Sequence, residues 1–511
     1  MIRSNQINRN IVWFILTASV SLFLTICVMY PILQTGIEGV FYSIDPDIVY
    51  FSNALLYIKA GVVGYFDHPG TLAITTIAYS YIPIRLYTKL VLHQNFIEWA
   101  FYNFDYLIFY TRLFQSLLFF IGLTIFSWSV FVVSKSRLSQ IISTLLIFGF
   151  TPIYFVVGSI SAEPLTFFLT AVYMLLFANY HTFGKQWFLW GLFIVSGVLF
   201  SVRATTFFYI PLTFLVYCYT VKPKYLGLNS KDFYRHVVLI VIGFLIGVHP
   251  LKYQIVKMLS RLLFFAGSGQ VHGGGSFFDI KNYITALTGF AYTDSLAAVL
   301  LFVVLLILIK NIRKGINLVD LVAATSVVGA FIFAKLPLSH YQLSNYVLLV
   351  FSAGYFSLKL NRFKKIFLLI IILLAVVPIS NKYFFETKKS INYEVSLEGY
   401  IKENPAQKST LWEWARSKDF AAIWVRDWGG GLFDKELSEV TKNFELSSDF
   451  TKIRTGASTY VNLSSFCWDT LYIQESSLER FINTNKHMQF TNNVVPGSEK
   501  IVSVKSKHCL K

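Results

Sequence analysis

The sequence is poor in charge. Only 14% of its 511 residues are Asp, Glu, Lys or Arg, whereas 55% are hydrophobic and the mean hydropathy is +0.57. A soluble globular domain carries about 25% charged residues, so this composition excludes an ordinary soluble protein. It predicts a mainly α-helical, polytopic membrane protein.

Acidic residues are scarcer than basic ones, with 27 Asp and Glu against 44 Lys and Arg, which gives a net charge of +17. Outside the C-terminal region most of the basic residues lie in short segments between apolar runs, which is the topology signal of a membrane protein. The positive charge therefore does not indicate nucleic acid as a partner. We expect membrane lipid instead.

Cysteine is rare as well. Cys27 and Cys218 lie in apolar segments and are expected to be packing residues. Cys467 and Cys509 lie in the polar C-terminal region and could pair if that region faces an oxidising compartment, which the sequence leaves open. No Cys or His spacing typical of a metal site occurs, and no internal repeat has a fixed period. No cofactor is implied with certainty, and a divalent metal held by carboxylate oxygens of the first loop is left open.

Long apolar runs are abundant, and runs of about 20 residues predict membrane helices. Eleven such segments are expected, at residues 11–33, 110–133, 138–158, 164–181, 187–203, 205–221, 236–256, 291–309, 318–336, 341–358 and 364–380.

Charge parity sets the predicted topology. With Arg3 and Arg9 cytoplasmic, the first helix leaves segment 34–109 outside, and the later basic clusters then all fall inside, as the positive-inside rule requires. If the apolar stretch 71–92 spanned the membrane, every one of those basic clusters would lie outside instead. We therefore expect an interfacial or re-entrant helix there.

Two domains are expected. Residues 1–380 are predicted to form the transmembrane domain with its long first external loop, and residues 381–511 a small extracytoplasmic α/β domain in which Ala421–Val425 is a buried strand. The protein is thus expected to be a multi-pass protein of the cell (plasma) membrane. Its N-terminus would be cytoplasmic, and its active site and C-terminal domain would lie outside.

The first external loop holds the residues around which we interpret the chain. Asp45 and Asp47 flank Pro46, and Asp67 and His68 follow later in the loop. Charge near a bilayer is costly, so such a cluster is a functional-site candidate. A structural role is equally ordinary. Asp45 before Pro46 would open a helix as its N-cap, and Asp47 would then lie in the first turn, where the helix dipole favours an anion.

Four later polar residues are predicted on the same external face. Glu163 begins a helix, where the dipole again favours a carboxylate, and Arg203 interrupts two apolar runs, as an interfacial anchor does. Lys335, at the end of an apolar helix, could likewise be only an interfacial anchor. A histidine near a helix start, such as His340, is commonly a polar residue with its hydrogen bonds satisfied and no further role. Their agreement on one face makes them candidates.

Carboxylates early in the chain and cations late suit one kind of reaction. A carboxylate can accept the proton of an attacking hydroxyl as a general base. Cations near the membrane surface can stabilise a departing phosphate, whose negative charge grows in the transition state. A sugar linked to a lipid phosphate supplies such a leaving group, and a single displacement inverts the sugar carbon without a covalent enzyme intermediate.

With these residues the sequence resembles the GT-C superfamily of integral-membrane glycosyltransferases, especially the protein mannosyltransferase and aminoarabinose transferase branch. The resemblance covers roughly residues 11–380. It rests on an apolar first helix and an acidic first loop, an acid in the second external loop, an Arg before a Pro-containing helix, and a late Ser-His-Tyr. These features are Asp45-Pro46-Asp47 with Tyr50 and His68-Pro69-Gly70, then Glu163, Arg203 to Pro211, and Ser339-His340-Tyr341.

The resemblance implies roles for these residues. The family's Pro-Asp-Glu maps onto Pro46-Asp47-Ile48, so Asp47 takes the role of the catalytic base and Asp45 can substitute for the missing Glu. Glu163 becomes the second acid. The phosphate of a polyprenyl-phosphate sugar donor would be bound by Arg203, His340 and Lys335, and the substrates by His68 and Tyr50. The acceptor is a glycan, lipid or protein outside the cytoplasm, as in the building of a cell-envelope glycoconjugate.

Two other functions stay open from the sequence. A transporter or flippase of lipid-linked saccharide would be expected to show repeated halves and polar groups near mid-membrane, whereas here the polar groups gather at one face. A polysaccharide polymerase or ligase shares the chemistry of the transferase and differs mainly in its donor.

Overall fold

The computed structural model describes residues 2–511 except 44–45, 65–69, 221–230, 250–254, 257, 259, 261–283, 286, 290, 292–293, 334–341, 405–409, 414–415, 429–431, 434–436, 438–443, 448, 455–459, 498–500 and 507–511. The chain divides into two compact units. Unit 1 comprises Met1–Met29, Phe66–Ala73 and Gln115–Tyr383, and unit 2 comprises Tyr30–Tyr65, Ile74–Phe114 and Phe384–Lys511. The expected division at residue 380 stays a prediction.

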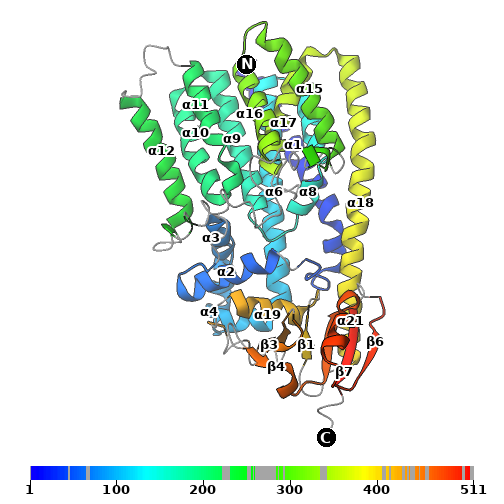
Figure 1. The fold of residues 1–511 in the computed structure, drawn as a ribbon. Coiled ribbons are helices and arrows are strands. Elements are labelled where there is room, and N and C mark those ends of the chain that lie inside the picture. Colours follow the sequence, from blue (N-terminus) through cyan, green and yellow to red (C-terminus); the bar gives the residue numbers. More distant parts are fainter. Residues whose placement is uncertain are drawn as a thin grey trace. The chain divides into compact units, whose positions relative to one another are not determined.

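Helices dominate both units (Figure 1). Their bounds are α1 Ile2–Thr35, α2 Asp47–Ala60, α3 Thr71–Ser80, α4 Ile82–Leu90, α5 Phe96–Tyr102, α6 Phe104–Ser134, α7 Arg137–Ile147, α8 Thr151–Val156, α9 Glu163–Phe183, α10 Gln186–Val202, η1 Ala204–Thr206, α11 Tyr209–Thr220, α12 Lys231–Val248, α15 Ser295–Ile312, α16 Leu318–Phe333, α17 Leu343–Phe356, η5 Ser357–Lys359, α18 Arg362–Glu403, α19 Lys418–Trp428 and α21 Glu475–Thr484.

Each of the eleven predicted apolar segments overlaps at least one of these helices. Among the described residues, five helices are long and apolar enough to cross a membrane: those over Asn10–Thr35, Phe104–Ser134, Glu163–Phe183, Ser295–Ile312 and Arg362–Glu403. The predicted stretch 71–92 forms two short helices, α3 and α4, each too short to cross. The number of spans remains a prediction.

The segment 138–158, expected as one helix, is broken. Helix α7 ends at Ile147, and α8 restarts at Thr151 with Pro152 in its first turn. Proline has no N–H to donate within a helix, so it is tolerated in the first turn and disfavoured in the interior. A single helix over this segment was therefore wrong.

In unit 1, helices α9 and α10 form an antiparallel hairpin around Gly184, which has a φ of 63°. Helix α12 packs on α10 through glycines at Gly197, Gly243 and Gly247. A Cβ added at Gly243 would lie 2.0 Å from the Ile194 carbonyl oxygen. The backbones therefore approach as closely as in the small-residue contacts of membrane helices.

Helix α17 forms the interior of unit 1. It packs against α7, α9, α15 and α16, and residues Leu343 to Ser352 are all buried. A helix that is buried all round belongs to the middle of a bundle. Its polar residues have internal partners; the Tyr346 hydroxyl, for example, lies 2.8 Å from Asp294 Oδ2.

In unit 2, the loop after α1 packs on the C-terminal part of α18. Gly39 has a φ of 81°, and a Cβ there would lie 2.6 Å from Ile391 of α18. Helix α19 packs against α2, and Phe101 of α5 contacts Phe433 with ring centroids 5.4 Å apart. The first loop and the C-terminal region are therefore parts of one compact unit.

A seven-stranded mixed sheet completes unit 2, with strand order β4-β3-β2-β1-β5-β7-β6 (Figure 1). Strand β1 is parallel to β2 and β5, and the other pairs are antiparallel. The strands are β1 Thr410–Trp412, β2 Phe444–Leu446, β3 Lys452–Arg454, β4 Tyr460–Asn462, β5 Thr470–Gln474, β6 Phe490–Val494 and β7 Ile501–Ser506. Leu411, Trp468, Leu471 and Phe481 belong to its apolar core. The predicted small α/β region is confirmed.

One element of this region was predicted wrongly. Ala421–Val425, expected as a strand, lies inside helix α19. The Phe420 N–H donates to the Ser417 hydroxyl at 3.1 Å, so Ser417 supplies the cap that starts the helix. An apolar run of five residues cannot by itself distinguish a buried strand from a buried helix face.

Candidate functional site

Asp47 is the first residue of helix α2 and has no exposed surface. Pro46 occupies the N-cap position and supplies no side-chain cap, so the acidic residue of the first turn is Asp47, as expected. The helix dipole favours a carboxylate there. Asp45 lies outside the described residues, so its expected capping role is not observed.

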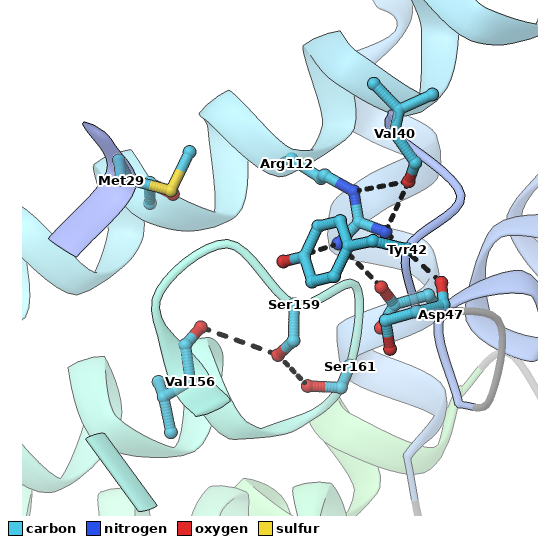
Figure 2. A network of polar contacts seen from close by, with 10 residues as sticks. Met29, Val40, Tyr42, Asp47, Arg112, Val156, Ser159 and Ser161 are labelled. Carbon is cyan, nitrogen blue, oxygen red and sulfur yellow. Dashed lines mark hydrogen bonds and ion pairs between the residues drawn. The ribbon is translucent and has the colours of Figure 1, made fainter. Parts of the chain in front are cut away.

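Arg112 of α6 is the ion-pair partner of Asp47 (Figure 2). Its Nη1 lies 2.6 Å from Asp47 Oδ2, and neither side chain is exposed. The guanidinium also donates to the Val40 carbonyl from Nε at 3.1 Å and from Nη2 at 2.7 Å, and to the Ser43 carbonyl at 3.2 Å. Arg112 thus joins the loop before α2 to the acid that begins it.

Tyr42 completes this cluster. The Arg112 guanidinium carbon lies 4.5 Å from the centre of its ring, and Arg112 Nη1 lies 3.4 Å from its hydroxyl. Burial raises the pKa of the Tyr42 phenol, and Asp47 raises it further against the opposing effect of Arg112. Tyr42 is therefore neutral near pH 7, and the charges of the cluster belong to Asp47 and Arg112.

A buried pair of this kind depends on its geometry. Removing charge from water costs several kcal/mol per ion, which a buried pair offsets only with good geometry and further hydrogen bonds. Here Arg112 meets Asp47 and two backbone carbonyls at once. A carboxylate held in this way is fixed in orientation.

A second acid–base pair lies in unit 1. Glu163 is the first residue of α9 and Arg203 follows the last residue of α10, and Arg203 Nη1 contacts Glu163 Oε1. Because α9 and α10 form an antiparallel hairpin, the start of one and the end of the other lie at the same end. The residues are 40 positions apart and both nearly buried.

The segment that leads to Glu163 is irregular but buried. Gly158 has a φ of 89°, and the hydroxyls of Ser159 and Ser161 lie 2.8 Å apart (Figure 2). Ser159 also donates to the Val156 carbonyl at 3.4 Å. Backbone without regular structure is tolerated at membrane depth only where protein shields it, as it does here.

Other parts of unit 1 meet at the same end. The Thr71 hydroxyl donates to the Gly247 carbonyl at 2.9 Å, and Gly247 packs against Ser201, two residues before Arg203. The Tyr209 hydroxyl donates to the Ser344 carbonyl at 2.9 Å, which joins the starts of α11 and α17. The start of α3 and the ends of α10 and α12 therefore contact one another, and so do the starts of α11 and α17.

Several predicted site residues are not described. Asp45, His68, Lys335 and His340 all lie outside the described residues. Tyr50 is described; it lies one turn after Asp47 in α2 and is 3% exposed. The structure thus pairs Asp47 with Arg112 and Glu163 with Arg203, and it leaves the roles of the other residues as predictions.

Sequence reasoning missed two residues of the first cluster. Arg112 is a charged residue within a predicted membrane segment, which is itself a signal of function, and that signal went unused. Glu394, in the C-terminal part of α18, is 2% exposed. It acts electrostatically on Tyr42 and Arg112. No local pattern indicates it, because more than 280 residues separate it from Arg112.

Within the described ranges, no three His, Cys, Asp or Glu residues lie close enough together to hold a metal ion. The acid at the centre of the first cluster is paired with an arginine. Cys467 is disulfide-bonded, whereas Cys27 and Cys218 are free. Cys509, whose pairing with Cys467 the sequence left open, lies outside the described residues.

No protein-family model and no curated protein matches the sequence. Solved structures of ArnT from Cupriavidus metallidurans do match. The apo structure aligns with a TM-score of 0.54 at 12% identity, over 98% of this chain and 99% of that one. The structure bound to undecaprenyl phosphate aligns with a TM-score of 0.48 at 13% identity, over 97% of both chains.

At such low identity the likeness to apo ArnT shows the fold alone, and it extends over nearly the whole of both chains. It agrees with the helices of unit 1 and with the small sheet after them. The chain therefore has the polytopic, mainly helical fold of ArnT, with helices of membrane-spanning length and a small sheet after them.

Proposed function

We propose that this protein is a membrane glycosyltransferase that transfers a sugar from a polyprenyl-phosphate donor to an acceptor outside the cytoplasm. The observation on which the proposal depends is the buried Asp47–Arg112 pair at the start of a loop helix. The fold supports it, because an acid in the first loop is where the resembling family has its base.

Asp47 is the proposed general base. The acceptor hydroxyl gives its proton to the Asp47 carboxylate while its oxygen forms a bond to the anomeric carbon of the sugar. The bond from that carbon to the phosphate oxygen breaks, and the polyprenyl phosphate leaves with the electron pair. The sugar carbon is inverted and no covalent enzyme intermediate forms.

Arg112 holds this base in place. Its contacts with the Val40 and Ser43 carbonyls fix the guanidinium, and the guanidinium fixes Asp47. Asp47 has no exposed surface, so the proposal requires that substrate binding make it accessible. Asp45 is proposed as the neighbouring acid, and His68 and Tyr50 as substrate contacts.

The Glu163–Arg203 pair is proposed to serve the leaving group. A guanidinium has five N–H donors in a rigid fork, so it can hold a carboxylate on one side and a phosphate on another. Glu163 would orient Arg203, and Arg203 would stabilise the phosphate as its negative charge grows. Lys335 and His340 are proposed as further phosphate contacts.

The direct test offers the purified protein a panel of undecaprenyl-phosphate sugars, together with lipid, glycan and protein fractions of the cell envelope as acceptors. Formation of undecaprenyl phosphate with labelled sugar in one fraction supports the proposal. The control is Asp47→Glu, which keeps the charge and moves the carboxylate by one methylene. A protein that moves intact lipid-linked sugar across vesicles without cleaving it would be a transporter, and the proposal would be wrong.

A further inference from the structure

Helix α4 has an exposed apolar face. Ile82, Leu86 and Leu90, at spacings of four residues, are 44%, 52% and 66% exposed, and Tyr87 is 50% exposed. Thr88 is the one buried residue of this helix, so the opposite side faces the protein. An apolar face of this kind on a short helix is typical of a helix lying in a membrane interface.

Two cations border that face. Arg85 and Lys89 lie one turn apart on α4, and both are exposed. Neither forms an ion pair within the part of the chain that the structure describes. They line a groove of about 650 Å³ together with Lys59 of α2 and with Gln94 and Asn95 before α5. Its described lining contains no Asp or Glu, so the groove is suited to an anion.

Lys59 differs from the other two cations. Its ammonium group contacts the Leu432 carbonyl and lies 5.3 Å from the centre of the Phe433 ring. It therefore also holds the C-terminal part of unit 2, and changing it would disturb that contact. Arg85 and Lys89 are the cations whose removal tests ligand binding alone.

A second groove marks the membrane level. It has a volume of about 480 Å³, lies on the other side of α4 and is lined almost wholly by apolar surface. Tyr87, Trp99, Tyr106, Tyr110 and Leu113 are among its lining residues. Tyr110 and Leu113 belong to α6, a helix long and apolar enough to cross the membrane. Tyr and Trp gather at the level of lipid headgroups, so α4 lies where a membrane helix leaves the bilayer.

We propose that the groove between α2, α4 and α5 binds the phosphate headgroup of an anionic membrane phospholipid. Arg85 and Lys89 contact the phosphate, while Leu86 and Leu90 extend into the acyl region of the same leaflet. A soluble anion would satisfy the two charges but would leave the apolar face of α4 in water. This site does not depend on the proposed transferase activity.

The test is native mass spectrometry of the full-length protein in detergent, titrated with dioleoyl phosphatidylglycerol or dioleoyl phosphatidylcholine. We expect one phosphatidylglycerol to bind more tightly than phosphatidylcholine. Two cations near a membrane surface each contribute on the order of 1 kcal/mol, so Arg85→Gln with Lys89→Gln should weaken that binding about 10- to 30-fold. Leu86→Gln with Leu90→Gln should weaken it as well, although no charge is lost.

The matched control removes two exposed lysines of the C-terminal region, Lys452→Gln in β3 with Lys486→Gln in the turn after α21, and should leave phosphatidylglycerol binding unchanged. Equal weakening in this control would mean unspecific charge attraction and would overturn the proposal. Inorganic phosphate that displaces the lipid, with no effect of the leucine substitutions, would indicate a soluble-anion site and would also overturn it. Elution of every variant as one monodisperse peak establishes that it is folded.

Discussion

Arg112 Nη1 lies 2.6 Å from Asp47 Oδ2, and neither side chain has exposed surface. The two residues are 65 positions apart, in a loop helix and in a membrane helix. Asp47 is the one acidic residue of α2, and the ion pair joins it to α6. The stability of unit 2 and the proposed activity are therefore expected to depend on the same contact.

Removal of the Arg112 charge should be costly. Arg112→Gln leaves a buried carboxylate without its cation, and breaking one side of such a pair costs about 3–5 kcal/mol. Arg112→Lys keeps the charge and should therefore lose less stability than Arg112→Gln. It should still lose some, because an ammonium group lacks the planar fork that reaches two carbonyls and a carboxylate. Thermal unfolding in detergent measures both variants. Equal stability of Arg112→Gln and wild type would contradict the buried pair.

Asp47 can be tested without confusing folding with catalysis. Asp47→Asn leaves Arg112 buried without a counter-charge and is expected to lower both stability and sugar transfer. Asp47→Glu retains the pair and should lower kcat by at least about 100-fold, because a general base contributes about 10²–10⁴-fold and works only when positioned. Wild-type turnover in a folded Asp47→Glu variant would mean that Asp47 is not the general base.

The Glu163–Arg203 pair allows a double-mutant cycle. If Glu163 acts through Arg203, then Glu163→Gln and Arg203→Gln should each lower kcat/KM for the lipid donor more than kcat/KM for the acceptor. The double variant should then be little worse than Arg203→Gln, because residues in contact are not additive. Steady-state kinetics with each substrate varied in turn measures this. Additive losses, or an effect on the use of the acceptor alone, would contradict this role, and Arg203 would then be only an interfacial anchor.

Glycine packing between α10 and α12 gives a prediction about folding. A Cβ at Gly243 would meet the Ile194 carbonyl oxygen at 2.0 Å, whereas a Cβ at Gly399 of α18 meets nothing within 4 Å. Gly243→Ala should therefore reduce the yield and thermal stability of the protein. Gly399→Ala should be neutral or stabilising by up to about 1 kcal/mol, because alanine favours a helix. The opposite order would contradict the α10–α12 contact.

Much of the helical architecture could be predicted, because apolar runs of membrane length have few alternatives to a helix. The contacts that make the site could not. The pairing of Asp47 with Arg112 joins α2 to α6, and the proximity of Glu394 to Tyr42 and Arg112 depends on the loop before α2 packing on α18. No local sequence pattern encodes contacts between residues so far apart in the chain. Gly243-Phe-Leu-Ile-Gly247 has the G-x-x-x-G spacing of a close helix contact and was a usable signal. Ser417 was the overlooked cap that distinguishes helix α19 from a strand.

Topology can be measured by labelling single cysteines with a membrane-impermeant maleimide. In a background of Cys27→Ala and Cys218→Ala, Arg85→Cys in α4 should label from outside intact cells, because the first loop is predicted to be external. Arg137→Cys, at the start of α7, should label only after the membrane is permeabilised. Both positions are exposed, so failure to react would not arise from burial. Labelling of both from outside would mean that the chain between Arg85 and Arg137 does not cross the membrane once, and the eleven-span topology would be wrong.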